Sequence, residues 1–291
     1  MVLVADQTDA SRNKFVFEGV LLDVTYLDRE RFRVPEQVLS DYHLAPSFQS
    51  ANVVVSPFAD LDELWLSVCE QYAKPEWIRR RCRHAEANVL RHLASIGKDR
   101  PLHDQVMSCL FGAGVTAHIL LTAGLRNPTV KSRYVAVRHL LDETGHGAFH
   151  KTMLRLLGSE QMSGERVRHH LSSLEEVFDA AAARAWRTKL PFAADISAVA
   201  RPAAIDSGRE LVDRRWHCEA MFWIAVTHSR CQAVLAEDAP ERLMERFRTS
   251  YRDLLADLGL ATPASIEKRR TEIEGALPDI CDLAEAILSH Q

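Results

Sequence analysis

The sequence predicts an α+β protein, in which a short mixed sheet at the N-terminus is followed by a large all-α domain. Up to about Pro57 the apolar residues come in short, strand-like runs, whereas beyond it they recur at helical spacing. With 291 residues, 47% of them hydrophobic and 26% charged, the chain suits one large or two modest domains with full cores. We therefore predict a sheet-containing part over residues 1–57 and a helical part over residues 58–291.

The expected strands lie close together at the start of the chain, and one of them carries an isolated carboxylate. They cover residues 2–4, 14–18, 20–26 and 52–55, with a hinge at Gly19. Asp23 stands inside the third apolar run. Burying a lone ionisable group in an apolar strand is costly unless it binds a metal or a partner. Asp23 is therefore the first candidate site residue, although a strand aspartate can also simply face solvent at an edge.

The expected helices fill the remainder, and proline, glycine and capping residues punctuate them. Ser163 fits the N-cap of a long helix. The stretch 106–125 is apolar but is interrupted by polar residues and glycines, so we interpret it as a buried helix rather than a membrane span. The helical ranges that we expect run from Asp60 or Asp62 to about 72, then 75–93, 102–125, 128–141, 149–157, 163–188, 199–215, 216–235, 241–258 and 265–288.

The net charge limits the kinds of partner that we expect, and the pattern of cysteines indicates the cellular compartment. A formal net charge of -4 argues against bulk nucleic acid as the main partner, because such proteins show a strong basic excess. The six cysteines are scattered without a C-x-x-C pair, which favours free thiols in a reducing cytoplasm. No signal peptide pattern opens the sequence. Small molecules or other proteins are the expected partners, without a membrane.

Four long strings of residues resemble one known family. They are Glu18-Gly-Val-Leu-Leu-Asp-Val-Thr-Tyr26, the segment 35–45, the segment 127–141, and the segment 192–202 continued through 210–211 and 219–224. Together they resemble the nucleotidyltransferase superfamily, with its DNA polymerase beta-like fold. The likeness is to bacterial nucleotidyltransferase-domain proteins that carry a long helical C-terminal region. The resemblance implies a partial nucleotidyltransferase core over 1–57, packed on the helical domain.

The resemblance also implies a reaction and a role for Asp23. Family members transfer a nucleoside monophosphate from a nucleoside triphosphate to a hydroxyl acceptor, and two Mg²⁺ ions clamp the reacting phosphate. Asp23 matches the family's third catalytic carboxylate, and so is implied to be both catalytic and a metal ligand. The acceptor and the nucleotide remain open. Magnesium is the implied cofactor, because its ligands are oxygen atoms.

The chain departs from the family pattern before Asp23. Before Asp23 it contains neither the Gly-Ser turn that binds the triphosphate nor the Asp-x-Asp strand that holds both metals. Asp6 and Asp9 have the character of turn residues. We expect either a truncated sequence whose true start lies upstream or a degenerate member without catalysis. In both cases the 291-residue chain should show weak or no transfer, and its exposed sheet edge should favour self-association.

A basic segment in the helical part is the candidate nucleotide-binding element. Lys131, Arg133, Tyr134 and Arg138 follow Pro128 on an expected helix with valines between them. Cations near a helix start can contact a triphosphate, so Lys131, Arg133 and Tyr134 are the implied cofactor-binding residues. A solvated basic face is the alternative.

Two rival functions remain open. Glu143 and His146 reproduce the Glu-x-x-His of helical di-iron proteins, which would make a helical metal-binding protein. Gly145 and Gly147 weaken a continuous helix there, and no second Glu-x-x-His occurs. The other rival is a non-catalytic helical binding or interaction protein.

Overall fold

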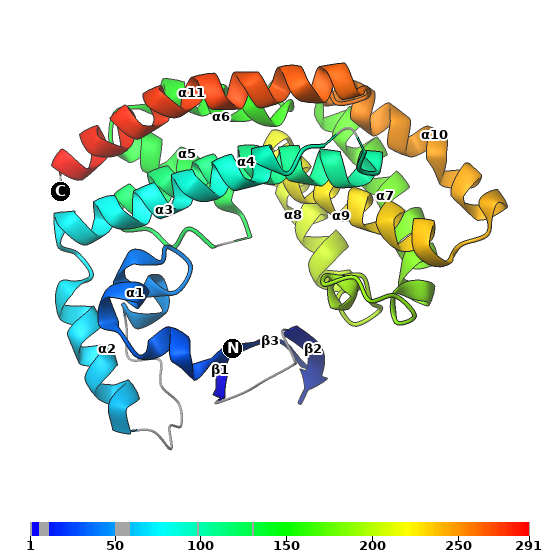
Figure 1. Ribbon diagram of the computed structural model, residues 1–291. Coiled ribbons are helices and arrows are strands. Elements are labelled where there is room, and N and C mark those ends of the chain that lie inside the picture. Colours follow the sequence, from blue (N-terminus) through cyan, green and yellow to red (C-terminus); the bar gives the residue numbers. More distant parts are fainter. Residues whose placement is uncertain (1, 6–11, 50–58, 98, 130, 291) are drawn as a thin grey trace.

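A three-stranded mixed sheet opens the chain (Figure 1). The computed structural model describes residues 2–5, 12–49, 59–97, 99–129 and 131–290. Strand β3 (Val20–Asp28) is central, parallel to β1 (Val2–Ala5) on one side and antiparallel to β2 (Arg12–Phe17) on the other. The α+β class is thus confirmed in this coarse form. The fourth expected strand, 52–55, lies outside the described residues.

A two-residue turn fixes the register of the β2–β3 hairpin. Glu18 and Gly19 both have positive φ, at 48° and 79°. Positive φ at both central positions is the geometry whose twist matches a tight hairpin, and glycine adopts it without strain. Phe17 therefore pairs with Val20, and counting back along both strands places Lys14 opposite Asp23.

Short helical elements lead from the sheet into the helical part. They are η1 (Arg29–Phe32), α1 (Pro35–Ser40) and η2 (Ala45–Phe48). Their apolar residues form a small core with the following helices, built from Phe32, Val38, Leu39, Leu64, Val68 and Trp77. These short helical elements therefore pack against α2 and α3.

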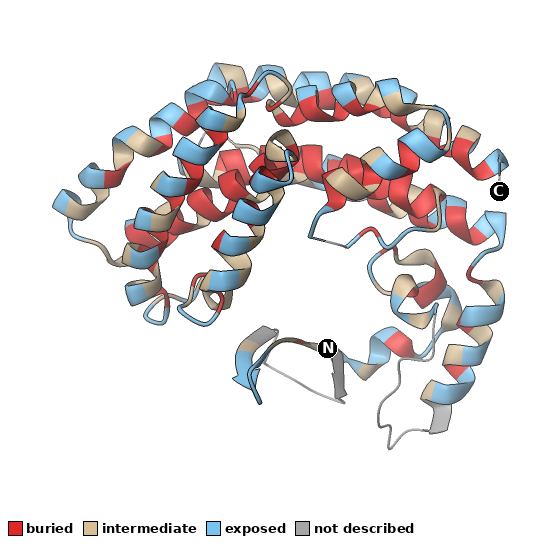
Figure 2. Cartoon of the chain, turned by 180° about the vertical axis from the view of Figure 1, so that it is seen from behind, coloured by how far each residue is buried: buried red, intermediate tan, exposed pale blue. Residues whose placement is uncertain are grey.

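The long helices arch around a central apolar helix, α4 (Leu102–Ala123), with buried residues on their inner faces (Figure 2). Helix α4 packs against α3, α9 and α11. Within the described residues it alone is long and apolar enough to cross a membrane, yet 89% of that stretch is buried inside the structure. The other helices are α2 (Ala59–Gln71), α3 (Pro75–Ala94), α5 (Arg133–Glu143), α6 (His150–Leu157), α7 (Gly164–Ala185), α8 (Ser207–Asp213), α9 (His217–Asp238), α10 (Glu241–Asp257) and α11 (Pro263–Ser289), with 3₁₀ turns η3 (Gly147–Phe149) and η4 (Ala193–Asp195) and the π-helical turn η5 (Pro202–Asp206).

Several predicted helix ends are confirmed. The Ser163 hydroxyl accepts a hydrogen bond from the Arg166 amide at 3.1 Å, which caps α7. Gly158 ends α6 with φ of 92°. Helix α11 continues through Pro278, within the expected range 265–288.

The start of α5 was predicted too early. Asn127 accepts hydrogen bonds through its side chain from the backbone amide and the hydroxyl of Thr129, at 2.9 and 2.8 Å. This local turn competes with helix formation. The helix accordingly begins at Arg133 instead of Pro128, and Lys131 precedes it.

Candidate functional site

Asp23 lies on a strand, as predicted; the strand is the central β3, and Asp23 is paired across the hairpin. Its carboxylate is 3.1 Å from Nζ of Lys14, the residue opposite it on β2. The Asp23 side chain is 41% exposed and that of Lys14 only 12%. The carboxylate is thus accessible, but a lysine already neutralises part of its charge.

Lys14 also connects the sheet to the helical domain. Its Nζ lies 2.8 Å from Asp195 on η4, and the other carboxylate oxygen of Asp195 lies 2.9 Å from Nη1 of Arg230 on α9. We call Asp23, Lys14, Asp195 and Arg230 the charged chain. Its two inner members, Lys14 and Asp195, are 12% and 10% exposed, so solvent screens their interaction only weakly.

The charged chain ends in a group of aromatic rings and arginines. Arg230 lies over Phe192, with 5.2 Å from Cζ to the ring centroid, and Arg133 lies over Phe222 at 4.6 Å. Cations over aromatic faces are attracted by the ring quadrupole. We call this group the cation–aromatic cluster; its members are Arg133, Arg230, Phe111, Phe192, Phe222 and Trp223.

Arg133 is the most deeply buried cation of the cluster. It is 6% exposed, and no carboxylate pairs with it among the residues that the structure describes. Its Nε likewise has no hydrogen-bond partner within the described chain. Burial lowers the pKa of Arg133 to about 10, which still leaves it charged at neutral pH. A buried guanidinium without an anion is costly, so this site favours an anionic ligand.

Lys131 borders the same cluster from the turn before α5. Its backbone carbonyl accepts a hydrogen bond from Nε1 of Trp223 at 2.8 Å, which ties this turn to α9. By accessible area Lys131 is exposed. Desolvation by the surrounding protein atoms, followed by repulsion from Lys14, nevertheless lowers the pKa of Lys131 to about 8, while Asp195 opposes this shift.

The structure separates the other members of the predicted basic segment. Tyr134 is 1% exposed in the core, and its ring centroid is 5.9 Å from that of Phe222. Arg138 pairs with the buried Glu219 at 3.2 Å and stacks on Trp216 instead. Lys131 and Arg133 therefore join the candidate site, Tyr134 supports it from within, and Arg138 lies in a different contact.

The Glu143/His146 metal site is not formed. Helix α5 ends at Glu143, and Gly145 then turns the chain with φ of 78°, so Glu143 and His146 do not share a helical face. Glu143 instead pairs with Arg126 at 2.6 Å. Throughout the described ranges, no three histidine, cysteine, aspartate or glutamate side chains come together in a way that could hold a metal ion.

Three residues of the charged chain were missed in the sequence analysis. Lys14 had a usable signal, because a two-residue turn at Glu18 and Gly19 places it opposite Asp23. Asp195 and Arg230 had none, since they approach the sheet only through the tertiary fold.

Comparisons with protein-family models, with curated proteins and with solved structures find no match for this chain.

Proposed function

We propose that this protein is nucleotidyltransferase-like and binds a nucleoside triphosphate between the sheet and the cation–aromatic cluster. Members of the family that the sequence resembles transfer a nucleoside monophosphate to a hydroxyl acceptor. The observation that carries the proposal is the charged chain, which links the strand carboxylate Asp23 to Arg230 and its aromatic neighbours. Arg133, Arg230 and Lys131 supply positive charge for phosphates, and the rings of Trp223 and Phe192 supply faces on which a base can stack.

The residues in place do not complete a magnesium site. Mg²⁺ in such enzymes is held by carboxylates together with substrate phosphates. Asp23 offers one carboxylate, and Lys14 lies 3.1 Å from it. No further carboxylate joins Asp23 in a metal-binding group in the part of the chain that the structure describes. Nucleotidyl transfer therefore requires carboxylates in addition to those that the described residues place beside Asp23.

Binding and turnover give separate tests. A fluorescent nucleoside triphosphate should bind the 291-residue chain, and Arg230→Gln should weaken that binding by about 10- to 100-fold, since a hydrogen bond to a charged group contributes about 1.5–3 kcal/mol. Arg187→Gln is the matched control. Like Arg230, Arg187 stacks on a tryptophan, Trp186, and pairs with a carboxylate that is distant in sequence, Asp238. Equal effects of the two substitutions would refute the site.

Turnover is tested with labelled triphosphates, Mg²⁺ and a panel of hydroxyl acceptors. We expect weak or no transfer by this chain. A version extended upstream, if the gene encodes Gly-Ser and Asp-x-Asp there, should be active and should lose transfer in Asp23→Asn while staying folded. Robust Mg²⁺-dependent turnover by the 291-residue chain would contradict the incomplete-site argument.

The second candidate is a non-catalytic binding protein of the cytoplasm. The Lys14–Asp23 pair favours it, because a lysine against the carboxylate competes with a metal ion for the same oxygen atoms. This candidate predicts ligand binding without turnover even in an extended chain.

A further inference from the structure

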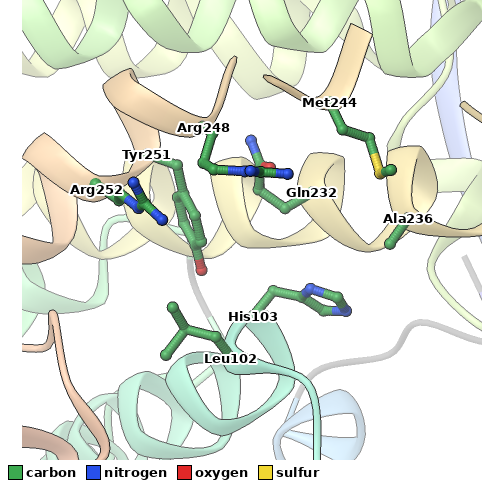
Figure 3. A pocket seen from close by; sticks show the side chains of 8 residues that line it. All are labelled: Leu102, His103, Gln232, Ala236, Met244, Arg248, Tyr251 and Arg252. Atoms are coloured by element: carbon green, nitrogen blue, oxygen red, sulfur yellow. The ribbon is translucent and has the colours of Figure 1, made fainter. Parts of the chain in front are cut away.

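A cavity of about 280 Å³ lies between the start of α4 and helices α9 and α10, and no member of the charged chain lines it. This volume is just below the usual range for small-molecule sites. His103 of α4 faces Gln232 of α9 and Tyr251 of α10 across it (Figure 3). Three helices from distant parts of the sequence thus border an open hollow that the proposed function does not use.

The polar groups of this cavity are chiefly donors. Nε2 of Gln232 is buried and has no hydrogen-bond partner among the described residues. A buried amide N–H without an acceptor is costly, so it favours a ligand that supplies an oxygen. The imidazole of His103 lines the opposite wall, and burial lowers its pKa, so at neutral pH it is an uncharged ring with one N–H to donate.

The positive charge of the cavity is concentrated on Arg252. Arg248 also lines the wall, but it pairs with Glu241 at 2.6 Å and Glu245 at 2.5 Å, which balance its charge. For Arg252 no ion pair is found within the described part of the chain. The nearby Asp104 pairs with Arg100 at 3.4 Å and lies 3.8 Å from Nε2 of the lining residue His103. Among the described residues, Arg252 is therefore the lining cation that no carboxylate pairs with.

The apolar part of the wall lies at the other end. Figure 3 shows Met244 and Ala236 together on the side opposite Arg252. The Tyr251 ring lines the cavity between Arg252 and this apolar end. Its hydroxyl oxygen is 2.9 Å from Oγ of Ser229. A ligand with a charged head and an apolar body matches this separation of polar and apolar surface.

We propose that this cavity binds a small monocarboxylate with an apolar body, with the carboxylate toward Gln232 and Arg252 and the apolar part against Met244 and Ala236. Such a ligand supplies the acceptor that Gln232 lacks and an anion for Arg252. The site is separate from the nucleotide site, and its occupancy does not depend on the proposed function.

The test uses hexanoate and hexan-1-ol as probes on the full chain, followed by isotope-edited NMR. Hexanoate should shift the signals of the residues that line the cavity and bind at least about tenfold more tightly than hexan-1-ol, a difference of about 1.4 kcal/mol. Arg252→Gln should weaken hexanoate binding by about fivefold or more, whereas Arg242→Gln, an exposed arginine of the same helix outside the cavity, should not. Gln232→Glu should abolish binding, because it replaces the donor by a carboxylate.

Three outcomes overturn the proposal. Equal affinities for hexanoate and hexan-1-ol would show an apolar hollow without anion recognition. Equal weakening by Arg252→Gln and Arg242→Gln would show only a general effect of charge. Absence of any shift at the lining residues up to the solubility of hexanoate would show that the cavity is not a site. Because Arg252 is exposed, its variant remains folded and informative even if Gln232→Glu does not fold.

Discussion

The ammonium group of Lys14 lies 2.8 Å from the carboxylate of Asp195, and this ion pair joins the N-terminal sheet to the helical domain. Lys14 also pairs with Asp23 at 3.1 Å, so one lysine holds two carboxylates from different parts of the chain. The pairing sets the position of Asp23 relative to the cation–aromatic cluster. This dual contact makes Lys14 the residue whose removal tests the arrangement most directly.

Lys14→Met should destabilise the protein by about 1–3 kcal/mol. The side chain of Lys14 is 12% exposed, and its loss removes one cation from Asp195, which is 10% exposed and also pairs with Arg230 at 2.9 Å. Breaking one contact of a desolvated ion-pair network carries a cost of this order. Urea unfolding measures the change, and the exposed Lys189→Met serves as the control with an expected change within about 0.5 kcal/mol. Indistinguishable midpoints for the two variants would contradict the role of Lys14.

Lys131 should titrate near pH 8, well below an ordinary lysine. Desolvation is the main cause, and the positive charge of Lys14 adds to it. In Lys14→Met the pKa of Lys131 should therefore rise. Competitive labelling of amines with an acylating reagent at several pH values, read by mass spectrometry, gives the titration midpoint directly. A midpoint that does not move in Lys14→Met would show that the two ammonium groups do not interact.

Gly114→Ala should destabilise the protein, because a Cβ at this position would overlap the ring of Phe222. Overpacking a core costs about 1–3 kcal/mol, which exceeds the gain of about 1 kcal/mol in helix propensity. Gly275→Ala on α11 is the matched control. Its Cβ would meet no atom within 4 Å, so only the gain in helix propensity applies. Opposite signs are expected in urea unfolding. Stabilisation by both substitutions would show that the contact between α4 and Phe222 is looser than the structure indicates.

Much of this architecture was predictable from local sequence, because turns and caps act over a few residues. The Glu18-Gly19 turn determines the hairpin, and Ser163 and Gly158 determine helix ends. The start of α5 was missed because the Asn127 side chain diverts the backbone. The approach of Asp195 and Arg230 to Lys14 could not be predicted, since it depends on how α7, α9 and the segment between them pack. Asp23 was found because a carboxylate is unusual in an apolar strand, but its lysine partner required the hairpin register.

Stability should fall in mild acid partly because of His228. Burial, with a further contribution from the charge of His170, lowers the pKa of His228 from an unfolded value of about 6.5 to about 3. Between these values the unfolded state binds more protons, so stability decreases as the pH falls. The contribution between pH 7 and pH 5 is about 2 kcal/mol. His228→Phe should therefore lose about 2 kcal/mol less over this interval than the parent, measured by urea unfolding at both pH values. His290→Phe, exposed beyond α11, should behave as the parent does.

Self-association should occur through the outer edge of β2. Among the described strands β2 lies at one end of the sheet. Element η4 packs against β2 at Lys14, but Val16, Phe17 and Val20 at the hairpin end are 55%, 60% and 59% exposed. An apolar edge strand presents unpaired backbone groups that a second chain can extend. Sedimentation velocity at increasing protein concentration should show a monomer–dimer equilibrium.

Val16→Lys should shift this equilibrium toward the monomer, because a charge on an edge strand opposes edge-to-edge pairing. Leu66→Lys is the matched control: Leu66 is an equally exposed apolar residue, at 54%, but it lies on helix α2, where no strand edge is available. If both substitutions reduce dimer formation equally, association depends on exposed apolar area in general. If only Val16→Lys reduces dimer formation, the backbone edge of β2 is the contact. The two substitutions remove similar apolar surface, but only Val16 lies on a strand at the edge of the sheet.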